Sequence, residues 1–98
     1  MKNTVTDPDL KETLDILGIP HDMNSLMERL PQSFVHDGTR YEFYLEQNED
    51  GTYEGNYGEE LFVLLCSYDY KNMVDAIAYC VEQVDQMIRN NEITDIEY

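Results

Sequence analysis

A period of two in the apolar residues of two hairpin-forming stretches between positions 34 and 57 constrains this fold more than any other feature of the sequence. Within Thr39–Gln47, every second side chain is large and apolar: Tyr41, Phe43 and Leu45. This period of two is typical of a strand with one face in a core. The dipeptides Asp37-Gly38 and Asp50-Gly51 flank the segment, and both are strong hairpin-turn signals. The sequence therefore predicts an antiparallel meander with one buried face and one polar face.

The second turn of this meander allows two registers. A two-residue turn at Asp50-Gly51 would pair Leu45 with Asn56 and Phe43 with Gly58. A three-residue loop, Glu49-Asp50-Gly51, would place Gly51 in the left-handed position of a bulge. That loop pairs Gln47 with Tyr53, Leu45 with Gly55, and Phe43 with Tyr57.

We favour the three-residue loop because it gathers the apolar side chains on one face, whereas a slip by one residue would send the tyrosines to the opposite face. The apolar face then carries Tyr41, Phe43, Leu45, Tyr53 and Tyr57. The opposite face carries Glu42, Tyr44, Glu46, Thr52, Glu54 and Asn56.

Residues 1–31 predict a helical N-terminal segment made of two short helices. Asp7-Pro8 is typical of a helix start, with a capping carboxylate before a proline at the first helical position. Gly18 and Pro20 end this helix. Asp22 caps the second one, whose apolar residues follow the helical spacing of one face: Met23, Leu26, Met27 and Leu30.

The remainder of the chain predicts a fourth strand and a long helix. Residues 61–67 are apolar on both faces, so we expect a central or covered strand. Residues 70–90 carry a continuous helical stripe, with Cys80 and Met87 at its edge: Met73, Val74, Ile77, Ala78, Val81, Val84 and Ile88. Asn72, Asp75, Tyr79, Glu82 and Gln86 form the opposite helix face, and Asp85 can pair with Arg89. The acidic tail, residues 91–98, is either frayed or a short edge strand.

Together these elements predict one α+β domain spanning residues 1–98. It comprises two short N-terminal helices, a three- or four-stranded antiparallel sheet over residues 32–67, and a long helix packed across the sheet. Cys66 and Cys80 lie in apolar stretches, which favours two buried, reduced thiols over a disulfide.

The charge of the chain is strongly one-sided. Twenty-one acidic residues oppose six basic ones, and the formal net charge is −15 at pH 7. Solubility asks for a net charge of only about 2–8 on a small domain. The excess therefore favours a basic protein partner, which such a field would attract. The basic residues are scattered singly, which excludes direct binding to nucleic acid or to an anionic membrane through a basic patch.

The location in the cell follows from two weaker signals. No apolar run approaches the roughly 20 residues of a membrane span. The first seven residues lack the apolar segment of a signal peptide. We expect a protein of the host cell's cytoplasm.

Motifs for catalysis or for a cofactor are missing, so we expect neither enzymatic activity nor a bound cofactor. His21 and His36 lie far apart without a neighbouring Cys or His at metal-ligand spacing. The stretch 46–57 faintly follows a calcium loop, but Tyr57 stands where a bidentate Glu is needed. No serine lies in a Gly-x-Ser-x-Gly context, and no glycine-rich phosphate loop is present.

In overall character the chain resembles the DNA-mimic inhibitors of phages and mobile elements, including anti-CRISPR and anti-restriction proteins. The resemblance is one of composition: small size, one domain, strong acidity, many tyrosines and no active site. It implies a non-catalytic inhibitor that occupies the positively charged nucleic-acid-binding surface of a CRISPR effector, a restriction enzyme or another nucleic-acid enzyme.

A second, local resemblance covers roughly residues 41–84. Three stretches are similar to HicB-like antitoxins: Tyr41-Glu42-Phe43-Tyr44-Leu45, Glu49-Asp50-Gly51-Thr52-Tyr53 and Met73-Val74-Asp75-Ala76-Ile77. The resemblance implies an antitoxin, or a related immunity protein, that neutralises a basic nuclease toxin. The chain departs from that pattern between residues 58 and 68, which contain no proline. An acidic accessory domain without an inhibitory role is the remaining alternative.

The register and the helical phase predict which residues would contact a partner. On the hairpin these are Glu42, Tyr44, Glu46, Glu49, Asp50 and Glu54; on the long helix they are Asp75, Tyr79 and Glu82. The apolar residues 61–66 could instead lie beneath a helix or in a homodimer interface, and the sequence leaves both open.

Overall fold

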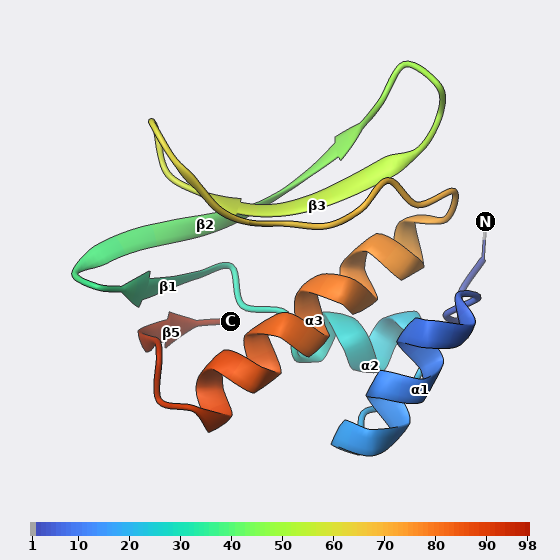
Figure 1. Cartoon of the computed structure of the whole chain (residues 1–98), viewed down its shortest axis with the longest axis horizontal. Helices are drawn as coiled ribbons and strands as arrows, with labels where there is room; N and C mark the ends of the chain where they lie inside the picture. The colour runs from blue at the N-terminus through green and yellow to red at the C-terminus, as the bar shows by residue number, and fades with distance from the viewer. Residues whose placement is uncertain (1) are drawn as a thin grey trace.

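All strands of the protein join one antiparallel sheet, and the longest helix packs across one side of it (Figure 1). The computed structural model describes residues 2–98. In chain order its elements are α1 (Pro8–Leu17), α2 (Met23–Glu28), β1 (Ser33–His36), β2 (Thr39–Gln47), β3 (Tyr53–Gly58), β4 (Val63–Cys66), α3 (Met73–Arg89) and β5 (Thr94–Glu97). The sheet has five strands in the order β4-β3-β2-β1-β5, so the α+β prediction is confirmed with one strand more than expected.

The β2–β3 hairpin adopts the three-residue loop and its register. Gln47 pairs with Tyr53, Leu45 with Gly55, and Phe43 with Tyr57. Gly51 has φ 86°, the left-handed conformation that the bulge needs. The first turn is also as predicted, since Asp37 (φ 48°) and Gly38 (φ 81°) are both left-handed, as in the favoured two-residue hairpin turn.

The helix signals act as predicted. The Asp7 side chain accepts hydrogen bonds from the backbone N–H groups of Asp9 and Leu10, and Gly18 ends α1 in the left-handed conformation. Asp22 caps α2 by accepting from the Ser25 N–H. On α3, Arg89 Nε lies 2.6 Å from Asp85 Oδ2, the expected pair one turn apart.

The core lies between the sheet and α3. Tyr57 is fully buried and packs against Phe34 with a ring-centroid distance of 4.8 Å. Its hydroxyl donates to the Pro31 carbonyl at 2.7 Å, which satisfies the one polar atom it buries. Helix and sheet approach closely at Gly55, where a Cβ would lie 2.7 Å from Cys80 Sγ.

The fourth strand is an edge strand, which corrects the prediction of a central or covered one. It spans only Val63–Cys66, and the residues before it lie in the open, with Leu61 91% and Phe62 55% exposed. The reason is topological. Since β1, β2 and β3 pair consecutively, a further strand can only be added at an outer edge. Cys66 is consequently exposed and not buried, whereas Cys80 is buried as expected.

The acidic tail forms β5, so the edge-strand alternative for residues 91–98 is the correct one. It pairs antiparallel with β1, with Ser33 opposite Glu97 and an irregular register toward Val35. Ile93, just before the strand, is buried and anchors the segment in the core.

Two acids of α3 lie in the interior, which corrects their expected place on a solvent-facing side of the helix. Asp75 is 3% exposed and Glu82 is 7% exposed. The N-terminal segment and α1 pack along the side of α3 that carries these residues (Figure 1). The helical phase is as predicted, but the N-terminal segment and α1 cover this side of α3.

Candidate functional site

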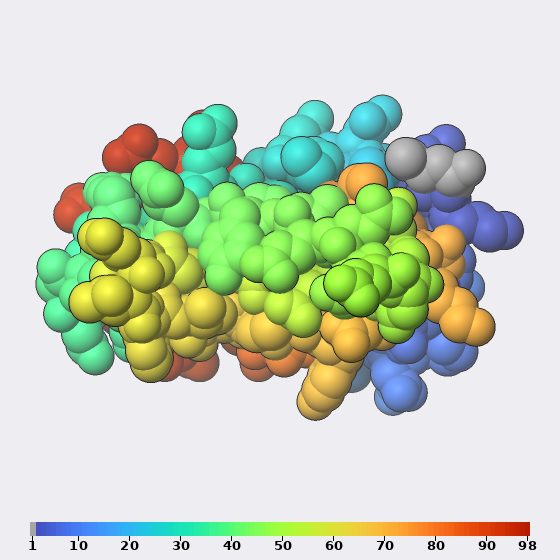
Figure 2. Space-filling view, turned by 90° about the horizontal axis from the view of Figure 1, so that it is seen from above, coloured from blue at the N-terminus to red at the C-terminus, as the bar shows by residue number. Residues whose placement is uncertain are grey.

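The side of the sheet that faces away from α3 carries acidic side chains at several neighbouring positions. It carries Glu42, Tyr44, Glu46, Glu54, Asn56 and Cys66, and we call it the outer face. Among residues 2–98, no helix covers this side, which is the concave upper side of the sheet in Figure 1. Figure 2 looks directly onto it and shows that the β2–β3 hairpin and the chain around β4 make up most of the surface.

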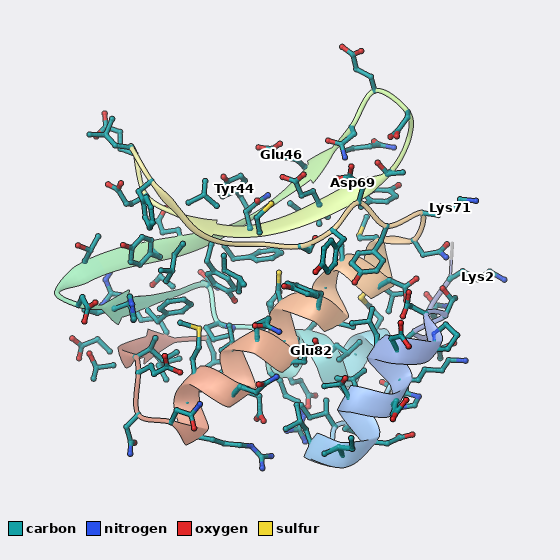
Figure 3. The ribbon with its side chains drawn as sticks, in the orientation of Figure 1. Lys2, Tyr44, Glu46, Asp69, Lys71 and Glu82 are labelled. Atoms are coloured by element: carbon teal, nitrogen blue, oxygen red, sulfur yellow. The ribbon has the colours of Figure 1, made fainter. Side chains whose placement is uncertain are left out.

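Strand pairing sets the arrangement of the outer face. Glu46 lies opposite Glu54, and Tyr44 lies opposite Asn56, which in turn pairs with Cys66. Tyr44 and Glu46 project on the same side of the hairpin (Figure 3). Because neighbouring strands are about 4.8 Å apart, Glu46 and Glu54 form a close pair across the hairpin, whereas Glu42 lies four residues, about 14 Å, from Glu46 along β2.

The side chains of the outer face differ in how much they are exposed to solvent. Glu42 and Glu46 are exposed, Tyr44 is 37% exposed, and Glu54 is half-buried. Asn56 is buried at 2%, and its Nδ2 donates to the Glu54 carbonyl at 3.3 Å. The array therefore presents carboxylates around one tyrosine ring to the solvent.

The acids impose a negative potential on the neutral groups between them. The pKa of the Cys66 thiol is raised to about 11 by partial burial, by a hydrogen bond with Glu54 and by the surrounding carboxylates. Partial burial, followed by the charge of Glu46, also raises the pKa of Tyr44. Both groups stay protonated at neutral pH, so neither adds charge and neither thiol nor phenol is an activated nucleophile here.

The hairpin tip extends this acidic surface. Glu49 and Asp50 are exposed. Hydrogen bonds from the hydroxyl and the N–H of Thr52 to Asp50 lower the pKa of its carboxyl, so it stays ionised. Asn48 Nδ2 donates to Asp69 Oδ1 at 3.1 Å, which ties one more carboxylate to the tip (Figure 3).

The structure divides the predicted contact residues between two regions. The hairpin residues Glu42, Tyr44, Glu46, Glu49, Asp50 and Glu54 come together on the outer face and its tip. Tyr79 and Glu82 lie on α3 beneath the sheet and face α1, and Asp75 is buried nearby. Sequence reasoning missed Asp69, which has no local signal because a contact across the loop positions it.

An apolar rim adjoins the outer face at its β4 edge. Leu61, Phe62 and Val63 are 91%, 55% and 43% exposed. A Cβ at Gly58 would lie 3.2 Å from both the Phe62 carbonyl oxygen and the Tyr44 ring, so the backbone of this rim lies near the tyrosine, whereas the Phe62 ring packs against Tyr41 at a centroid distance of 6.2 Å. Apolar and aromatic contact area beside charged groups is typical of protein interfaces.

The part of the chain that the structure describes was searched for metal-binding clusters and for membrane-spanning helices. Residues 2–98 contain no group of three or more His, Cys, Asp or Glu side chains able to hold a metal ion. No helix of these residues has both the length and the apolar character to cross a bilayer. Comparisons with known protein families, with curated proteins and with solved structures found no match.

Proposed function

We propose that this protein is a non-catalytic inhibitor that binds the positively charged nucleic-acid-binding surface of a partner protein and blocks it. The observation that carries the proposal is the uncovered outer face, which presents Glu42, Glu46 and Glu54 around Tyr44. This array belongs to a chain with net charge −15, so the whole molecule reinforces the local field.

The charge density of the outer face suits this role. Duplex DNA carries one negative charge per about 1.7 Å of its axis. On the rigid sheet, Glu46 and Glu54 lie about 5 Å apart, Glu42 lies about 14 Å further along β2, and Glu49 and Asp50 add charge at the tip, so the surface carries several negative charges over a short length. A groove that binds phosphates would therefore attract this surface, and the attraction would speed association and weaken as salt is added.

Contact area would come from the neighbours of the acids. Tyr44 offers a ring and a hydroxyl, and the rim of Leu61, Phe62 and Val63 offers exposed apolar surface at the β4 edge of the sheet. Aromatic anchors surrounded by polar groups account for much of the affinity in protein interfaces. The acids would thus guide the encounter, and the tyrosine with the rim would hold the complex.

The proposed partner class is a nucleic-acid enzyme of the host cytoplasm, such as a CRISPR effector or a restriction enzyme. An antitoxin or immunity protein against a basic nuclease would use the same surface in the same way. Identification of the bound protein separates these two cases.

The experiment compares two charge-reversed variants as baits in a lysate of the cells in which the protein occurs. The hairpin variant carries Glu42→Lys, Glu46→Lys and Glu54→Lys. The helix variant carries Glu12→Lys in α1, Glu28→Lys in α2 and Glu92→Lys just after α3. All three residues are exposed and lie outside the outer face, so both variants change the net charge equally. Bound proteins are eluted with rising salt and identified by mass spectrometry.

We expect wild-type protein and the helix variant to retain one nucleic-acid-binding protein, released by salt, and the hairpin variant to lose it. Circular dichroism of both variants controls for folding. Equal capture by the hairpin variant would remove the outer face from consideration. Capture of nothing specific by wild-type protein would favour an acidic accessory domain and overturn the proposal.

A further inference from the structure

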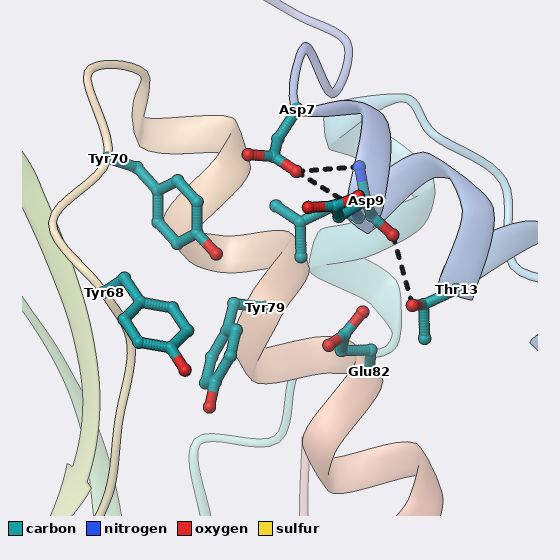
Figure 4. A pocket seen from close by; sticks show the side chains of 8 residues that line it. Asp7, Asp9, Thr13, Tyr68, Tyr70, Tyr79 and Glu82 are labelled. Carbon is teal, nitrogen blue, oxygen red and sulfur yellow. Dashed lines mark hydrogen bonds between the residues drawn. The ribbon is translucent and has the colours of Figure 1, made fainter.

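A cavity of about 330 Å³ opens between α1, α3 and the loop that precedes α3 (Figure 4). Its lining includes three tyrosines and three acids, and we call it the tyrosine pocket: Tyr68, Tyr70, Tyr79, Asp7, Asp9 and Glu82. Its volume lies at the lower end of the range of about 300–1,000 Å³ for small-molecule sites. It lies below the sheet, on a different side of the molecule from the outer face.

The three rings form a compact aromatic wall. Their centroids are 5.6 Å apart between Tyr68 and Tyr79, and 6.5 Å apart in both pairs with Tyr70. Tyr68 meets the other two rings edge-on, at interplanar angles of 79° and 74°. Cation–π attraction acts over the face of a ring within roughly 6 Å of its centroid, so three tyrosines this close together can attract a cation on their open side.

Backbone contacts hold this wall in place. Tyr53 and Tyr70 exchange two backbone hydrogen bonds, at 2.7 and 2.9 Å, which fix the loop against β3. Just before Tyr68, the Ser67 N–H donates to the Gly55 carbonyl at 2.8 Å. Tyr79 comes from α3 itself. The rings thus come from two rigidly attached segments, so the pocket is formed before any ligand arrives.

Glu82 supplies the second, independent observation. The residue is only 7% exposed, and its carboxylate points into the pocket opposite the rings (Figure 4). Its Oε2 atom has no hydrogen-bond partner among the described residues, and Oε1 accepts only a long bond of 3.4 Å from Gln83. A buried carboxylate oxygen without a partner costs free energy, and a positive group in the pocket would offset that cost.

We propose that the tyrosine pocket binds an organic cation, an alkylammonium or guanidinium group, with its charge between the Glu82 carboxylate and the three tyrosine rings. Asp7 and Asp9 at the start of α1 add negative charge at the mouth. Among the described residues, those that line the pocket include no basic side chain, so the protein does not itself fill the position. The group could be a lysine or arginine side chain of a protein or a free small amine.

The lining favours an organic cation over a bare metal ion. Metal ions such as Ca²⁺ and Mg²⁺ require six or more oxygen ligands at short range. Here three of the eight lining residues are tyrosines, and burial raises the pKa of Tyr70 and Tyr79, so their hydroxyls stay neutral. Aromatic faces beside a carboxylate are the arrangement that recognises alkylated ammonium groups.

The test uses small probes, so it does not depend on the proposed function. Choline chloride, N-acetylarginine amide and 3,3-dimethylbutan-1-ol, the uncharged carbon analogue of choline, are titrated into the labelled protein at constant ionic strength. NMR follows the ring signals of the tyrosines and the methyl signals of the probes. We expect at least one cation to bind saturably, with methyl signals shifted upfield by the rings, and the neutral analogue to bind at least tenfold more weakly.

Variants locate the binding. Tyr68 is 72% exposed, so Tyr68→Leu leaves the fold intact, and Glu82→Gln keeps the shape of the side chain. Each should weaken binding about tenfold. Tyr44→Leu, which removes an exposed tyrosine of the outer face, is the matched control and should leave the affinity unchanged.

The two cationic probes separate the sources. Tighter binding of N-acetylarginine amide supports a side chain of a protein, and tighter binding of choline supports a small alkylammonium molecule. The proposal is overturned if neither cation saturates, if the neutral analogue binds equally well, or if both pocket variants bind like the wild type.

Discussion

The acids of this protein occupy two contrasting environments, the outer face of the sheet and the interface between α1 and α3. On the outer face, Glu42 and Glu46 alternate with core residues along one strand and stand in water. On α3, Asp75 and Glu82 lie about two turns apart and are covered by the N-terminal segment and α1. The same carboxylate side chains are thus hydrated in one region and buried in the other, depending on what packs over them.

The covered region contains a second contrast. Asp75 is fully engaged, since it accepts hydrogen bonds from the Thr6 N–H at 2.8 Å and the Thr6 hydroxyl at 2.5 Å, with a longer one of 3.4 Å from the Asp7 N–H. Glu82 has one oxygen without a partner. Asp75 therefore fastens the N-terminal segment to α3, whereas Glu82 remains available to a ligand.

The largest expected effect breaks the first contrast. Asp75→Ala leaves the hydrogen-bond donors of Thr6 without their acceptor and should destabilise the protein by about 3 kcal/mol. Glu46→Ala, an exposed acid of the outer face, should change stability by no more than about 0.5 kcal/mol. Urea denaturation of both variants measures the difference. Equal losses would mean that burial does not distinguish the two regions.

A smaller effect reports the potential of the outer face without any partner. Because the pKa of Cys66 is raised to about 11, its thiolate is scarce, and iodoacetamide should modify it about tenfold more slowly at pH 8 than an unstructured cysteine peptide. Glu54→Gln should speed the reaction, and so should added salt. Mass spectrometry of the modified protein over time gives the rate. Modification of Cys66 at the rate of the peptide would contradict a strongly negative outer face.

The smallest expected effect concerns Glu82, whose Oε2 atom has no hydrogen-bond partner among the described residues. Burial and the nearby Asp7 raise the pKa of Glu82 in the folded protein, so its ionised form costs stability above its unfolded pKa. Glu82→Gln should therefore stabilise the protein by about 1 kcal/mol at pH 7.

The same linkage fixes the pH dependence of that gain. As the pH falls through the raised pKa, wild-type Glu82 takes up a proton and its cost disappears, so the advantage of Glu82→Gln should vanish near pH 4. Urea denaturation at both pH values measures it. A variant that is less stable at pH 7, or a gain that persists at pH 4, would mean that Glu82 has a partner in solution.

Local patterns in the sequence were sufficient for the elements and the hairpin register. Alternation in β2 and the position of Gly51 fixed which side chains face the core, because a slipped register would expose the tyrosines. The caps at Asp7 and Asp22 are equally local. The outer-face part of the candidate site followed from the same alternation.

Contacts between distant segments were beyond such patterns. The stretch around β4 is apolar on both faces, yet β4 lies at the edge of the sheet, because β2 occupies the other side of β3, and Val63 and Cys66 stay exposed. Asp75 and Glu82 have the phase of a solvent-facing side, and only the docking of α1 on α3 buries them. The tyrosine pocket arises from that same docking and leaves no trace in the local sequence.

Competition with nucleic acid tests the central claim most directly. The captured partner is titrated with wild-type protein in the absence and presence of that partner's own nucleic acid, and the affinity is measured at constant salt. A mimic that occupies the nucleic-acid surface predicts an apparent Kd that rises in proportion to the nucleic-acid concentration. An unchanged Kd, with nucleic acid and protein bound together on the partner, would contradict the account.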